Sequence, residues 1–105
     1  METIQELNNQ INELVSSINK DDMEKKDFIS HKYMHISLHV HTEREKLDLA
    51  HMTSSQKMAV KKQYDLYSSL ELMFKEKADT YTAEEMYHII LQAQKLVNTA
   101  NNETV

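Results

Sequence analysis

The stretch YMHISLHVHTEREKLD, residues 33–48, decides between two folds for this chain. With a period of two, apolar and polar residues alternate from Met34 to Val40, which is typical of a half-buried strand. In steps of three and four, the same stretch belongs to an apolar stripe typical of a helix and interrupted only by Glu43. The members of that stripe are Ile29, Tyr33, Ile36, Val40, Leu47 and Ala50.

The composition favours the helical interpretation. The 105 residues include no glycine and no proline, the two residues on which hairpins and tight turns depend most. We therefore predict an all-α fold, a small bundle of about four helices in a single domain. In this interpretation residues 33–41 belong to one long helix that runs from Asp22 to about His51.

The N-terminal segment carries a narrow apolar seam at heptad spacing. Its other positions are polar, so residues 1–20 are predicted to form a coiled-coil-like helix. Such a short helix is barely stable alone, so it pairs with another helix of the chain or with a second copy. A break at Asp21 separates it from a helical core at 22–99, and the polar residues 100–105 are expected to fray. The expected interface residues are Ile4, Leu7, Ile11, Leu14 and Ile18.

Three threonines have the spacing of a capping box, in which a hydroxyl accepts a hydrogen bond from an otherwise unpaired helix amide. The pairs are Thr42 with Glu45, Thr53 with Gln56, and Thr82 with Glu85. The second and third precede periodic apolar runs and predict helices over residues 54–79 and 83–99. A cap at Thr42 would instead favour an extended segment just before it.

A strand at residues 33–41 would have to pair with its own copy in a dimer. In that arrangement residues 36–72 resemble the ribbon-helix-helix family of DNA-binding regulators. The resemblance implies that the helix start at Ser54 holds phosphate and that three side chains enter the major groove: His35, Ser37 and His39. The chain departs from the family by lacking the turn glycine and by placing imidazoles where other side chains read the bases.

The formal net charge is −5, but the charges are unevenly distributed. Residues 31–62 carry six basic residues against three acidic ones, and five of the six histidines. A basic, histidine-rich middle segment can face an anion such as DNA. The candidate anion or DNA contacts are Lys32, His35, Ser37, His39, Arg44, Lys57, Lys61 and Lys62.

Potential metal ligands recur every four residues along the same segment if it is helical. The row comprises Asp27, His31, His35, His39 and Glu43. Neighbouring members can share a divalent metal such as zinc or nickel. All of them cannot, because each four-residue step drifts about 40° around the helix axis. We expect a solvated or interfacial row that binds no metal, and we expect no cofactor.

The composition also bounds the function. Without cysteine the chain has no thiolate nucleophile, and without glycine it has no phosphate loop or nucleophile elbow. No apolar run approaches the roughly 18 residues of a membrane span, and the N-terminus lacks a signal-peptide pattern. We therefore expect a cytoplasmic, non-enzymatic regulatory or adaptor protein, without a membrane contact or a small-molecule substrate. It would bind a partner protein and form a homodimer. The alternative is a dimeric DNA-binding transcriptional regulator of the ribbon-helix-helix type.

Overall fold

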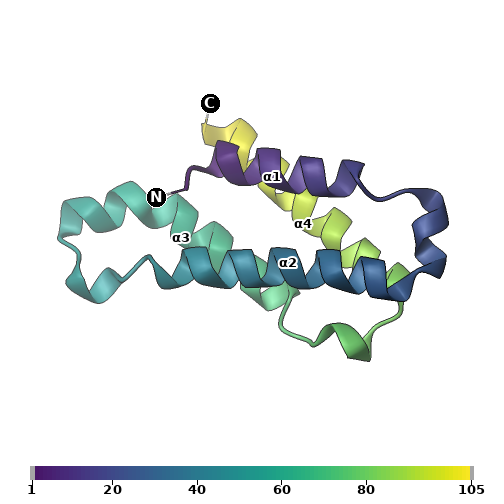
Figure 1. Cartoon of the computed structure of the whole chain (residues 1–105). Helices are drawn as coiled ribbons and strands as arrows, with labels where there is room; N and C mark the ends of the chain where they lie inside the picture. The colour runs from purple at the N-terminus through teal and green to yellow at the C-terminus, as the bar shows by residue number, and fades with distance from the viewer. Residues whose placement is uncertain (1, 105) are drawn as a thin grey trace.

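The computed structural model describes residues 2–104 and consists of helices and their connections (Figure 1). The α-helices are α1 (Ile4–Ser16), α2 (Lys26–Glu45), α3 (Ser54–Met73) and α4 (Ala83–Thr104). Short 3-10 helices at Lys20–Glu24, Leu49–His51 and Ala78–Thr80 lie between them. The protein is 83% helical, so the predicted all-α bundle of about four helices is confirmed.

The ambiguous stretch is helical. Residues 33–41 lie inside α2, and the apolar stripe of that helix faces the core. The strand interpretation is therefore wrong, and so is the ribbon that the ribbon-helix-helix resemblance implied. The helix is also shorter than predicted and spans Lys26–Glu45. Beyond its end, the Asp48 carboxylate caps a 3-10 turn by accepting a hydrogen bond from the Ala50 amide at 3.2 Å.

Two of the three predicted capping boxes are present. The Thr53 hydroxyl accepts a hydrogen bond from the Gln56 amide at 3.2 Å, and the Gln56 side chain accepts one from the Thr53 amide at 2.9 Å. Thr82 and Glu85 form the same pair of bonds, at 3.1 and 2.9 Å. The predicted cap at Thr42 is wrong, because this residue lies within α2.

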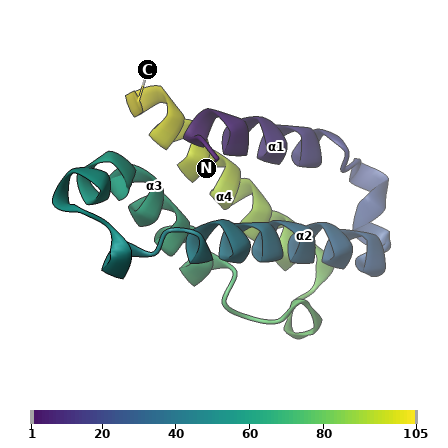
Figure 2. The ribbon, with the colours of Figure 1, turned by 60° about the vertical axis from the view of Figure 1, so that its left-hand side comes forward.

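The four α-helices form an elongated bundle that measures 48 × 27 × 16 Å along its principal axes. Successive helices reverse direction, and α4 lies between α1 and α2 in two views that differ by 60° (Figures 1 and 2). α4 contacts each of the other three α-helices and carries the most deeply buried stripe, formed by Met86, Ile90, Ala93 and Val97. Among residues 2–104, no helix is long and apolar enough to cross a membrane.

The C-terminal segment for which fraying was predicted, residues 100–105, is helical through Thr104. α4 continues to Thr104, and Ala100 still packs against the core. The end of α4 lies beside the start of α1 (Figure 1). This contact supports the last turns of α4, whereas the polar composition alone suggested fraying. Of the predicted tail, Val105 lies outside the described residues.

Candidate functional site

The predicted seam of residues 1–20 is buried inside the chain, but the helix that carries it is shorter than predicted: α1 ends at Ser16, and Ile18 lies beyond it. Ile4, Leu7, Ile11 and Ile18 are each at most 8% exposed, and Leu14 packs partly buried against the same core. The principal neighbour of α1 is α4 of the same chain. The apolar stripe therefore meets its need for burial within the monomer. The dimer interface predicted at these residues is replaced by an intrachain contact.

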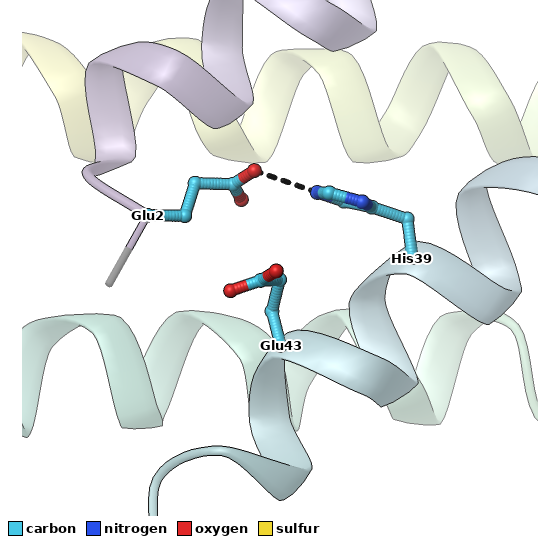
Figure 3. Close-up of side chains that lie close together, drawn as sticks. All are labelled: Glu2, His39 and Glu43. Atoms are coloured by element: carbon cyan, nitrogen blue, oxygen red, sulfur yellow. Dashed lines mark hydrogen bonds and ion pairs between the residues drawn. The ribbon is translucent and has the colours of Figure 1, made fainter.

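A cluster of polar side chains lies where the start of the chain meets α2 (Figure 3). Glu2 and Glu43 are each 8% exposed, and His39 is half-buried beside them. The His39 Nε2 atom lies 2.7 Å from Glu2 Oε2. One ligand atom from each of the three residues can be chosen so that all lie within 4.8 Å of one another. We call Glu2, His39 and Glu43 the carboxylate–histidine cluster.

Further hydrogen bonds hold both carboxylates of this cluster in place. The Tyr67 hydroxyl donates to Glu2 Oε1 at 2.5 Å, and the Gln10 amide donates to Glu2 Oε2 at 2.8 Å. The Lys46 ammonium donates to Glu43 Oε1 at 2.8 Å. Burial, together with the hydrogen bond to Glu2, raises the pKa of Tyr67, so its hydroxyl stays a donor. The hydrogen bond from Lys46 to Glu43 raises the pKa of Lys46, which therefore stays charged.

Of the predicted row of potential metal ligands, only His39 and Glu43 belong to this cluster. His31, His35 and His39 line a groove of about 520 Å³ between α1 and α2. Successive members of the row are about 6 Å apart along the helix axis, since a helix rises about 1.5 Å per residue. Within residues 2–104, only the carboxylate–histidine cluster brings three potential ligands together.

A second groove, of about 920 Å³, lies between α2 and the segment that joins α3 to α4. Tyr33 links α2 to this segment. Its hydroxyl donates a hydrogen bond to the Glu76 carbonyl at 3.1 Å, and the centroid of its ring lies 5.0 Å from that of the Phe74 ring. Met34 and Leu38, also in the lining, are 58% and 67% exposed. We call this the α2 groove. These large apolar side chains are exposed to solvent, where they do not stabilise the fold of a monomer.

The predicted anion contacts are spread over α2 and α3 and mostly have partners. Lys32 lies 5.1 Å from the centroid of the Phe28 ring, Arg44 lies 3.3 Å from Glu71, and Lys61 lies 2.7 Å from Asp65. Lys57 and Lys62 are exposed on the first half of α3. On α2, His35 is exposed, Ser37 lines the α2 groove, and His39 contacts Glu2.

Comparison with protein-family models, with curated proteins and with solved structures finds no match to this chain.

Sequence analysis missed part of both sites. Glu43 did carry a signal, since it interrupts the apolar stripe of α2, and it is buried where the stripe required burial. Glu2 carried none, because it precedes the first helix and pairs with residues 37 and 65 positions away. Met34 and Leu38 were noticed only as members of an alternating pattern.

Proposed function

We propose that this chain is a small, non-enzymatic regulatory or adaptor protein that acts by helix-mediated protein binding, and that it associates with a second copy of itself. The contact surface is the α2 groove. The supporting observation is that Met34 and Leu38 are exposed one helical turn apart, beside a groove of about 920 Å³. Contacts at this spacing are typical of a helix that packs against another helix.

The charges of the α2 groove favour a second copy as the occupant. Its rim carries two lysines, Lys75 and Lys77, and two carboxylates, Glu76 and Asp79, so its fixed charges balance. A two-fold contact brings the same patch of each copy together, and a balanced patch can then pair each sign with its opposite. A strongly charged partner gains no net attraction from such a rim.

The experiment measures molar mass in solution over a range of concentrations. We expect a dimer for the unchanged protein and a monomer for the double variant Met34→Glu/Leu38→Glu, because burying a charge in an apolar contact is costly. Leu72→Glu is the matched control, since Leu72 is 71% exposed on α3 and lies outside the α2 groove. A monomer at every concentration, or a dimer that survives the double variant with its helix content intact, overturns the proposal.

Contact with DNA is a second candidate, supported by the exposed Lys57 and Lys62 near the start of α3, with Lys61 on the same helix. Because Arg44 already pairs with Glu71 and Lys61 with Asp65, we expect binding to duplex DNA to be weak. Binding should be measured at low and moderate salt with the unchanged chain and with a Lys57→Gln/Lys61→Gln/Lys62→Gln variant. Tight binding that falls steeply with salt and is lost in the variant would favour a DNA-binding regulator over the adaptor.

A further inference from the structure

We propose that the carboxylate–histidine cluster is a binding site for a divalent transition-metal ion of the zinc class, with Glu2, His39 and Glu43 as the ligands. A carboxylate oxygen and an imidazole nitrogen are both common zinc ligands, and three protein ligands leave a fourth position for water. The three side chains come from the N-terminal segment and from successive turns of α2. Figure 3 shows the two carboxylates and the imidazole converging on the same space.

The spacing of the ligand atoms fits such an ion after a small adjustment. Bonds of about 2.1 Å at tetrahedral angles place neighbouring ligand atoms roughly 3.4 Å apart. The ligand atoms of the cluster all lie within 4.8 Å of one another, and His39 Nε2 lies 2.7 Å from Glu2 Oε2. Binding therefore replaces the hydrogen bond between His39 and Glu2 by two bonds to the metal. The shifts required are on the order of 1 Å, within the reach of side-chain rotation.

The surroundings supply the outer hydrogen bonds that metal-binding carboxylates need. Tyr67 and Gln10 donate to Glu2, and Lys46 donates to Glu43. Partners of this kind fix the orientation of ligands and contribute to affinity. A random surface group of acids would not be held from outside by a buried tyrosine.

Burial gives a cation a reason to bind here. The side chains of Glu2 and Glu43 are only 6% and 9% exposed. The neighbouring Lys46 side chain is 59% exposed, so water screens its ammonium charge. Two carboxylates close together and shielded from water repel each other strongly. A divalent metal ion held between the three side chains offsets this charge.

The donor set also predicts which ions are excluded. Calcium and magnesium prefer sites made entirely of oxygen ligands, and the imidazole of His39 is a poor replacement for one of them. Zinc and neighbouring first-row metals accept nitrogen and oxygen together. We therefore expect saturable zinc binding that a large excess of magnesium does not displace.

The test is a titration of the metal-stripped full chain with zinc, followed by calorimetry and by the thermal midpoint. We expect one ion per chain and a midpoint that rises with zinc concentration. Glu43→Gln keeps the shape of the side chain and should weaken binding more than tenfold. Glu45→Gln is the matched control, because Glu45 lies on the same helix with a side chain that is 63% exposed.

A second set of measurements tests whether zinc binds instead to the exposed His41, which lies 2.9 Å from Glu71 and 3.8 Å from Glu45. His41→Gln should leave zinc binding unchanged. In the unchanged protein, zinc should shift the ring signals of His39 and not those of His41, a measurement that holds even if Glu43→Gln fails to fold. No saturable binding, equal binding by Glu43→Gln, or a shift confined to His41 overturns the proposal.

Discussion

Removing the hydroxyl of Tyr67 tests how strongly the carboxylate–histidine cluster stabilises the fold. Tyr67 and Tyr33 are both 1% exposed, and each donates one hydrogen bond from its hydroxyl. The acceptor of Tyr67 is the Glu2 carboxylate at 2.5 Å, whereas that of Tyr33 is the neutral Glu76 carbonyl at 3.1 Å. A bond to a charged group contributes about 1.5–3 kcal/mol, and one between neutral groups contributes about 1 kcal/mol.

We therefore expect Tyr67→Phe to lower the free energy of unfolding by about 2 kcal/mol, and Tyr33→Phe to lower it by about 1 kcal/mol. Urea denaturation followed by circular dichroism measures both losses, and the larger should shift the midpoint by about 1 M. Glu2→Gln and the double variant complete a cycle that isolates the pair. If Tyr67→Phe costs no more than Tyr33→Phe, Glu2 is not held as a buried carboxylate, and the argument for its surroundings fails.

Further predictions concern the helix cap at Thr82 and Glu85, the ionisation of Tyr33 at high pH, and the packing of α1. Thr82→Ala should lower the free energy of unfolding by about 1 kcal/mol. The hydrogen bonds from the Thr82 amide and hydroxyl lower the pKa of Glu85. The stability due to the Glu85 carboxylate is therefore present above the ordinary pKa of a glutamate and is lost as the pH falls through the lowered pKa. In an acid titration, the difference in stability between the unchanged protein and Glu85→Gln should then vanish. Burial, with neighbouring Tyr81 and Glu76, raises the pKa of Tyr33 to about 12. The stability due to its protonated phenol is therefore complete below pH of about 10 and is lost as the pH rises to about 12. Across that range, the free energy of unfolding should fall less steeply with pH for Tyr33→Phe than for the unchanged protein. Leu7→Ala should cost about 3 kcal/mol in thermal unfolding without changing molar mass, and Leu14→Ala should cost clearly less, because Leu7 is 1% exposed and Leu14 only half-buried.

The sequence predicted those parts of the fold that depend on local chemistry. The caps at Thr53 and Thr82 could be found because a capping box lies within four consecutive residues. The end of α2 could not, because the apolar stripe continues past Glu45 to Leu47, which is buried although it lies outside the helix. The partner of the α1 seam was equally hidden: periodicity shows that a stripe needs burial, but not whether the covering surface is the chain's own.

The candidate sites follow the same division. Glu43 was visible as a carboxylate on an apolar stripe, and it turned out to be one of the buried members of the cluster. Glu43 lies close to Glu2, which in turn accepts a hydrogen bond from Tyr67, and these positions are far apart in the chain, so no spacing rule addresses them. Sequence reasoning could therefore find a residue in an unusual position, while the group that explains the position required the fold.

The ambiguity of residues 33–48 has a structural cause that bears on function. Ile36 and Val40 belong to the stripe of α2 that the core buries, whereas Met34 and Leu38 form a second stripe on the exposed side. A helix with apolar residues on two faces alternates apolar and polar residues over several positions and so resembles a strand. The core accounts for only the first stripe. The second one is unnecessary for folding, so polar residues at Met34 and Leu38 should leave the stability of the monomer nearly unchanged while removing the surface through which we propose that two copies meet.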